Sequence, residues 1–221
     1  MASWMMHLRV ADALIDKLDA LSPREFVMGN LAPDSGIPNA NGIDYTPSSV
    51  ISHFKVYRPD GTRYINVPDY IDQYFKPEMR TSYSIEQYSF FLGYLVHLLT
   101  DALWNDQVYK PTLRLYPEEC TADRGTLVQK IKADWHEQDL LYLSKHPNLR
   151  TYVICRQCNA FPNRHIAFFP ENAFDERRKY VIEYYQQKHT PACDHLNLTT
   201  EQADNFVLTC SQHILQYIKN L

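Results

Sequence analysis

Hydrophobic residues recur at helical spacing along most of the chain, and the first such pattern begins near the start. It is formed by Trp4, Leu8, Ala11, Ile15 and Leu18. A period of three to four residues is typical of an amphipathic helix, so we expect a helix from Trp4 to Leu21. Pro23 ends this helix or begins a short second one through Met28. The following GNLAPDSG predicts a break in regular structure.

A long apolar helix is predicted to begin after Ser84 and to end near Asn105. Gln87 lies where a capping box places its second member, three residues after the serine. Three further patterns predict helices over about 121 or 126 to 144, 171 to 188 and 200 to 219. Thr200, Gln202 and Asp204 give the last of these a polar and acidic first turn.

Residues 36–83 lack a long periodic pattern and are rich in Tyr, Pro and Asp, which predicts a loop region. Asp60-Gly61 favours a hairpin turn within residues 58–64. Four tyrosines of this region can either line a cleft or support the scaffold: Tyr57, Tyr64, Tyr70 and Tyr74. We therefore predict a mainly α fold, in which residues 1–221 form one multi-helix domain with a long loop region between the second and third helices.

Composition narrows the class of protein. Proteins that bind long nucleic acids are usually basic, whereas this chain has a net charge of −4. A long nucleic acid is therefore not the expected partner. The first residues lack the basic and apolar regions of a secretory signal, and no run of ~18 apolar residues predicts a membrane span. We expect a cytoplasmic protein whose five cysteines are reduced, whereas its oligomeric state stays open.

The most informative polar residues lie on the apolar helix that follows Ser84. His97 and Asp101 are four residues apart, so both side chains point to the same side of that helix. Gly93 precedes them by one turn and allows another element to come close. A buried carboxylate must be paired or metal-bound, so two interpretations are open: a hydrogen-bonded polar pair in the core, or part of a metal site.

Other segments add potential ligands of the same type. His7 lies on the apolar face of the first predicted helix, Asp34 lies in the predicted break, and His53 follows SSVIS. Each residue alone has an ordinary structural explanation. Together with His97 and Asp101 they offer the imidazole and carboxylate donors that zinc prefers.

The predicted helix over 126–144 carries further polar residues beside its apolar face. Asp134 and Asp139 flank that face, and His136 points farther away. These residues can be ligands of a second metal, hydrogen-bond partners of the histidines, or surface charges.

Four ordered segments resemble the zinc-dependent phospholipase C family, which is related to single-strand nucleases. They are MMHLRVADAL, GNLAPDSG, SSVISHF and FFLGYLVHLLTDALW. The resemblance implies a helical fold with up to three zinc ions. It implies that one zinc ion is bound by Asp34, His53, His97 and Asp101. It also implies that Asp101 bridges two ions and that His7 binds the neighbouring ion.

The chain departs from the family pattern at two places. Trp4 is internal, whereas family members use the free amine of an N-terminal Trp, and Gln107 stands where the pattern has a histidine. The next helix offers DWHEQD, with Asp134, His136 and Asp139, in place of His-x3-Glu. The resemblance therefore implies one to three zinc ions, or another divalent metal.

The implied activity is hydrolysis of a small phosphate ester, either a diester or a monoester, by metal-activated water. Asp34 is the carboxylate predicted to orient or deprotonate that water. Two alternatives stay open: the same metal site serves another hydrolysis or tailoring reaction on a small metabolite, or the protein is a non-catalytic helical protein with a structural metal.

A second possible metal site lies in the C-terminal part of the chain. Cys155 and Cys158 form a CxxC pair, and Cys193 and His195 follow later. These four residues can form a structural zinc clip, or the cysteines can be ordinary reduced thiols.

Overall fold

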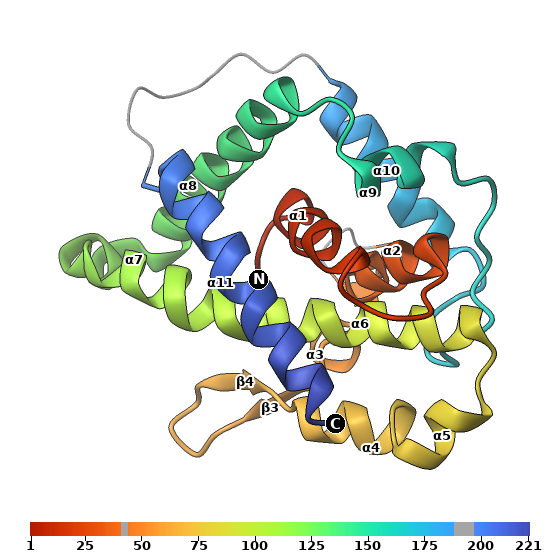
Figure 1. The fold of residues 1–221 in the computed structure, drawn as a ribbon. Coiled ribbons are helices and arrows are strands. Elements are labelled where there is room, and N and C mark those ends of the chain that lie inside the picture. The colour runs from red at the N-terminus through yellow and green to blue at the C-terminus, as the bar shows by residue number, and fades with distance from the viewer. Residues whose placement is uncertain (41–43, 188–196) are drawn as a thin grey trace.

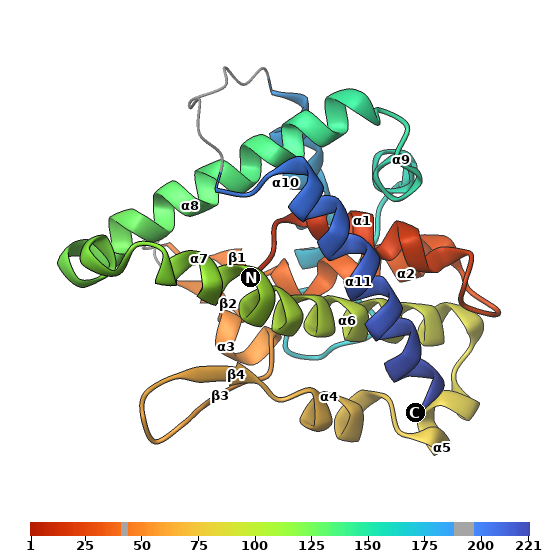
Figure 2. The same ribbon diagram turned by 60° about the vertical axis from the view of Figure 1, so that its left-hand side comes forward.

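The computed structural model describes residues 1–40, 44–187 and 197–221, and it is mainly helical (Figure 1). α1 (Trp4–Ile15) and α2 (Pro23–Leu31) lie against the long α6 (Ile85–Trp104), and α11 (Thr200–Lys219) crosses beside α1 and α6 (Figure 2). One continuous cluster of buried hydrophobic side chains contains residues of all four helices. The predicted fold class is confirmed.

The close approach of α2 and α6 depends on two glycines. A Cβ atom added to Gly93 would lie 2.1 Å from the carbonyl oxygen of Phe26, and one added to Gly29 would lie 2.0 Å from that of Phe90. Both distances are far below van der Waals contact, so only glycine allows the two backbones to touch. The expectation that Gly93 lets another element come close is confirmed, and the contact fixes where α6 presents His97.

The ends of the long helices follow the capping rules. Ser84 caps α6 and Thr199 caps α11, and in both cases a glutamine three residues later completes a capping box. The side chain of Ser3 accepts a hydrogen bond from the backbone N–H of Met6 and so caps α1. These local signals explain why the predicted beginnings of α6 and α11 agree with the structure.

Two boundaries predicted for the first helices are wrong. The first helix ends at Ile15 rather than Leu21, because the chain turns after Asp16 and Ala20 adopts a positive φ of 49°. The predicted break at GNLAPDSG is instead the end of α2 followed by a 3-10 turn, η1 (Ala32–Asp34). Gly29 serves helix packing here, whereas the sequence alone suggested a breaker.

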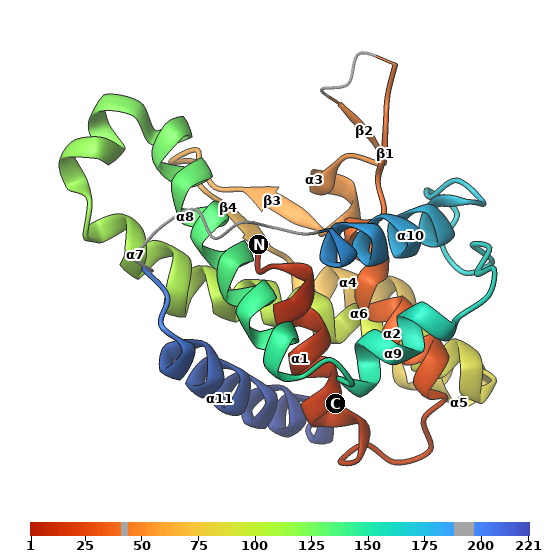
Figure 3. The ribbon, with the colours of Figure 1, turned by 90° about the horizontal axis from the view of Figure 1, so that it is seen from above.

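The loop region predicted over 36–83 contains more regular structure than expected. The predicted hairpin is confirmed as β3 (Lys55–Tyr57) paired antiparallel with β4 (Arg63–Ile65). Another short ribbon pairs β1 (Ile37–Pro38) with β2 (Tyr45–Thr46) and extends outward in Figure 3. Three short helices were not predicted: α3 (Ser49–Ser52), α4 (Val67–Tyr74) and α5 (Pro77–Ser82). They are too short to show periodicity, although Pro68 and Pro77 occupy the first turns of the last two.

The C-terminal half builds a wall beside α1. A π-helical segment, η2 (Asn105–Tyr109), and α7 (Lys110–Arg114) lead from α6 into α8 (Pro117–Lys145), which is kinked at Asp123. α10 (Ala173–Gln186) lies within the range predicted for it, whereas α9 (Arg150–Gln157) was not predicted. Among the described helices, none combines the length and apolar content that a membrane crossing requires.

Candidate metal centre

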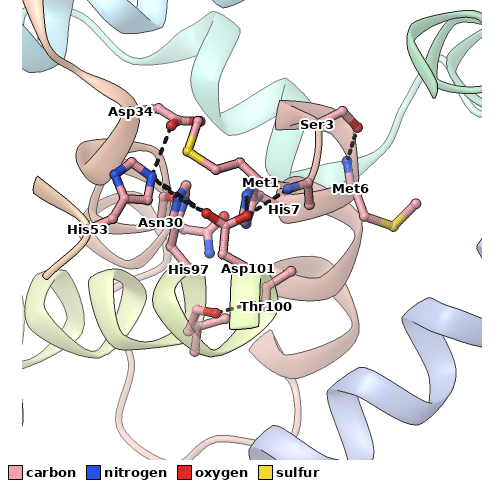
Figure 4. Close-up of polar contacts among 12 residues, drawn as sticks. Met1, Ser3, Met6, His7, Asn30, Asp34, His53, His97, Thr100 and Asp101 are labelled. Atoms are coloured by element: carbon pink, nitrogen blue, oxygen red, sulfur yellow. Dashed lines mark hydrogen bonds and ion pairs between the residues drawn. The ribbon is translucent and has the colours of Figure 1, made fainter. Parts of the chain in front are cut away.

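Five of the predicted ligands come together between α1 and α6 (Figure 4). His97 and Asp101 project from α6 and His7 from α1. Asp34 ends η1, and His53 directly follows α3. The three histidines and Asp101 are at most 1% exposed, and the side chain of Asp34 is 9% exposed. Four separate segments therefore place imidazoles and carboxylates in one dry volume.

The donor atoms lie within the reach of a shared cation. The Nε2 atoms of His53 and His97 are 3.3 Å apart, and His53 Nε2 lies 3.2 Å from Asp34 Oδ1. Asp101 Oδ2 lies 3.6 Å from His53 Nε2 and 3.8 Å from His97 Nε2. These contacts define two overlapping groups that share one histidine: Asp34, His53 and His97, and His7, His97 and Asp101.

Hydrogen bonds orient two of the imidazoles for metal binding. His97 donates its Nδ1–H to the carbonyl oxygen of Asn30, at 2.7 Å, so the neutral ring keeps an Nε2 lone pair directed at the cluster. Ser52 Oγ lies 2.9 Å from His53 Nδ1 and can accept a hydrogen bond from Nδ1–H, which would leave the Nε2 lone pair of His53 free. With both Nε2 atoms unprotonated, their lone pairs would face each other at 3.3 Å and repel unless a cation lay between them, whereas in the metal-free protein a proton on His53 Nε2 relieves that repulsion.

Three buried atoms of the cluster that could bind a metal lack a hydrogen-bond partner among the described residues. These are both ring nitrogens of His7 and Oδ2 of Asp101. The other carboxylate oxygen, Asp101 Oδ1, accepts the backbone N–H of Ala2 at 2.6 Å and lies 3.4 Å from His7 Nε2. Buried polar atoms without partners are costly, and a divalent cation would satisfy these atoms. The donor set therefore fits zinc, with imidazole and carboxylate ligands.

Electrostatics keep the cluster in its metal-binding protonation state. Burial, with a smaller contribution from nearby His7, lowers the pKa of His97 to about 3, so the imidazole is neutral at neutral pH. Burial acts to raise the pKa of Asp34 and Asp101, but interactions with nearby groups outweigh this effect and lower both pKa values. In the metal-free protein, a hydrogen bond from a proton on His53 Nε2 lowers the pKa of Asp34, and the positive charge of the amino terminus and contact with His7 lower that of Asp101. Both carboxyls are ionised and ready to bind a cation.

A cavity of about 540 Å³ opens beside the cluster, a volume typical of small-molecule sites. Asp34, Ser52 and His53 form part of its wall, and the remainder includes residues of α1, α8 and α10, the first three residues of the chain and residues from the segment 36–49. His7, His97 and Asp101 are not among the lining residues, so they lie behind this first wall. Asp34 is therefore the carboxylate of the cluster that reaches the cavity.

The acidic residues of α8 lie apart from the cluster. Asp139 accepts hydrogen bonds from Ser3 Oγ at 2.7 Å and from the Tyr185 hydroxyl at 2.8 Å. Asp134 accepts the backbone N–H of Asn197, and burial raises its pKa. His136 lines the cavity, with its Nδ1 atom 3.7 Å from Asp139 Oδ2. None of the three joins the groups that could hold an ion among the described residues, so their role as ligands stays a prediction.

The second possible metal site cannot be assembled from the described residues. Cys193 and His195 lie outside them, and Cys155 and Cys158 are free thiols within them. Burial raises the pKa of Cys155 to about 12, and Cys158 Sγ accepts a hydrogen bond from Arg24 Nε at 3.4 Å. The zinc clip stays a prediction.

The four tyrosines singled out in the predicted loop region do not line the cavity, whereas Tyr45 of the same region does. Tyr70 and Tyr74 pack in an aromatic cluster with Phe54, and Tyr70 donates a hydrogen bond to the carbonyl oxygen of Phe91. Tyr57 and Tyr64 lie exposed on the β3–β4 hairpin. Tyr70 and Tyr74 therefore support the scaffold, which is the second of the two roles considered from the sequence.

Several residues of the site were not found from the sequence. Ser52 was recognisable only as the neighbour of His53, and the carbonyl oxygen of Asn30 carries no signal of residue type. Lys132 and Arg177, which line the cavity, belong to α8 and α10 and resemble ordinary helix-surface cations. Their placement depends on tertiary packing.

The helical fold and the buried cluster of histidines and aspartates are those of a metal-dependent hydrolase. A sequence profile described as zinc dependent phospholipase C matches residues 6–220, which is nearly the whole chain. The chain belongs to the zinc-dependent phospholipase C family. No curated protein and no solved structure matches it significantly.

Proposed function

We propose that the protein hydrolyses a small phosphate ester, a diester or a monoester, with zinc held by His7, Asp34, His53, His97 and Asp101. The observation that carries this proposal is the pair of Nε2 atoms of His53 and His97, 3.3 Å apart and flanked by two carboxylates. Such a donor set suits a divalent cation, and it adjoins a cavity large enough for a small substrate.

Bound zinc would lower the pKa of a coordinated water to about 7 and neutralise charge that develops on a phosphoryl oxygen. Asp34 is the residue to orient or deprotonate the attacking water, because it is ionised and borders the cavity. His97 and His53 keep their Nδ1 atoms engaged by Asn30 and Ser52, which fixes the direction of both rings.

The geometry supports one or two ions in this cluster. The two overlapping groups share His97, whose single free nitrogen binds one ion at a time. A second ion would therefore depend on Asp101, which has one carboxylate oxygen near His7 and the other near His53 and His97. That arrangement supports Asp101 as the bridging carboxylate.

The test uses chelator-treated protein, with and without restored zinc, on a panel of phosphodiesters and phosphomonoesters. Zinc is expected to restore turnover of at least one class. Asp34→Asn is expected to lower kcat by at least 100-fold, with Asp106→Asn, exposed after α6, as the control. A zinc-loaded protein that cleaves none of the esters, or full activity of Asp34→Asn, would overturn the proposal.

A further inference from the structure

Two cationic side chains line the cavity without a carboxylate partner among the described residues. Lys132 projects from α8 and Arg177 from α10, and neither forms an ion pair there. The neighbouring Arg178 differs, because its guanidinium binds the carboxylate of Asp175 at 2.8 Å. A charge that lines a cavity without a counter-ion is available to a ligand.

Arg177 is held in place but leaves donors free. One NH2 group donates to the carbonyl oxygen of Gly36 at 3.3 Å, and the buried Nε atom has no hydrogen-bond partner among the described residues. The guanidinium carbon lies 5.3 Å from the ring centre of Trp4 and 5.4 Å from that of Tyr180. Stacking restricts the guanidinium without neutralising it, so the remaining donors suit a carboxylate or phosphate.

The cations and the candidate metal ligands come from different elements that line one cavity. Asp34 and His53 come from the segment around η1 and α3, whereas Lys132 and Arg177 come from α8 and α10. The volume of about 540 Å³ is far larger than a phosphate group, so an alcohol moiety fits beside a phosphate bound at the cluster. Asp44 also lines the cavity. If Asp34 binds the metal, two cationic side chains of the lining face one carboxylate that is not a candidate ligand.

We infer that Lys132 and Arg177 bind a second anionic group of the substrate, so that the preferred phosphate ester carries a carboxylate or another phosphate on its alcohol part. The inference rests on the proposed phosphate-ester hydrolysis. A positively charged alcohol part, by contrast, would meet two like charges in this cavity.

The first test compares soluble dihexanoyl phospholipids whose headgroups carry a phosphate (inositol 4-phosphate), no charge (glycerol) or a positive charge (choline). The zinc-loaded protein is expected to cleave the inositol 4-phosphate lipid with a kcat/KM at least 10-fold above that for the choline lipid. Lys132→Ala and Arg177→Ala are expected to reduce this preference about 5-fold each, and Arg177→Lys to retain most of it. Lys130→Ala, exposed on the same helix as Lys132, is the matched control.

Equal losses for all three lipids in Lys132→Ala would assign the two cations to the shared phosphate and overturn the inference. Cleavage without any headgroup preference would also overturn it, while leaving phosphate-ester hydrolysis intact. Absence of cleavage would instead count against the proposed function, and a binding experiment then decides the inference.

That binding experiment follows tryptophan fluorescence, since Trp4 lies beside Arg177 in the cavity wall. The zinc-loaded protein is titrated with 3-phosphoglycerate and with glycerol 3-phosphate, which lacks the carboxylate. About 10-fold tighter binding of 3-phosphoglycerate, lost in Lys132→Ala and kept in Lys130→Ala, is expected. Equal affinity for the two compounds would overturn the inference whether or not the protein cleaves a phosphate ester.

Discussion

His7 of α1 and His97 of α6 stack face to face, with ring centres 3.7 Å apart and an angle of 4° between the rings. Two charged imidazoles would repel strongly at this distance, so the stack disfavours a state in which both rings are charged at once. Both rings are fully buried beside Asp101. The contact joins the first helix to the central one at the place where a metal would bind.

The close contact of α2 and α6 is predicted to control the stability of the fold. Gly93→Ala forces a Cβ atom to within 2.1 Å of the Phe26 carbonyl oxygen, so the helices must separate. We expect the free energy of unfolding to fall by about 3 kcal/mol or more, measured by urea denaturation. Gly125→Ala on α8, where the nearest contact is a side-chain oxygen at 3.3 Å, serves as the control. Equal stability of the two variants would contradict the packing argument.

The hydroxyl of Ser52 is predicted to support metal binding through His53. Its contact with His53 Nδ1 at 2.9 Å directs the other ring nitrogen toward Asp34 and His97. Ser52→Ala is expected to weaken zinc affinity by about 10-fold to 100-fold in a competition titration with a zinc-binding dye. Ser49→Ala, on the same short helix, is the control. Unchanged affinity in Ser52→Ala would show that the ring needs no such support.

Asp139 offers a test that separates a structural role from metal binding. Its two carboxylate oxygens accept hydrogen bonds from Ser3 and Tyr185, which tie the beginning of α1 to α8 and α10. Asp139→Ala is expected to lower the free energy of unfolding by about 2–3 kcal/mol, because two buried donors lose their acceptor. Its zinc content, by elemental analysis, should equal that of the wild type. Loss of zinc in a folded variant would make Asp139 a ligand.

The stability of the metal-free protein is predicted to fall in acid. Burial lowers the pKa of His97 to about 3, so the unfolded state gains a proton that the folded state lacks as the pH falls below about 6.5. The unfolding free energy should therefore decrease from about pH 6.5 toward pH 3. The lowered pKa values of Asp34 and Asp101 give stability above about pH 4 that is lost at more acidic pH.

Urea denaturation of chelator-treated protein between pH 7.5 and pH 5 measures this effect. His97→Gln is expected to show a shallower dependence on pH, whereas the exposed His213→Gln on α11 should follow the wild type. The same slope for His97→Gln and for the wild type would contradict a neutral buried His97.

The sequence predicted those parts of the fold and the candidate site that depend on local spacing. The separation of His97 and Asp101 by four residues placed both on one side of a helix, and the capping box at Ser84 located where that helix begins. The convergence of His7, Asp34 and His53 was expected from residue type and from the family resemblance. In the structure these residues do come together, and the glycine contact that brings α2 against α6 helps to place Asp34 beside the residues of α6.

The features that the sequence missed depend on long-range contacts. α4 and α9 span eight residues each, too few to show a clear period, and packing against other helices stabilises them. Lys132 and Arg177 are far apart along the chain and carry no common motif, so only the packing of α8 and α10 beside α1 reveals that they share a cavity.

The most direct test of the account is a zinc-edge anomalous difference map from a crystal of the zinc-loaded protein. The account predicts a peak at about 2.0–2.2 Å from the Nε2 atoms of both His53 and His97, with Asp34 or Asp101 completing the coordination. A map without a peak in this cluster, or with zinc bound only elsewhere on the chain, would contradict the central claim that these five side chains form a metal centre.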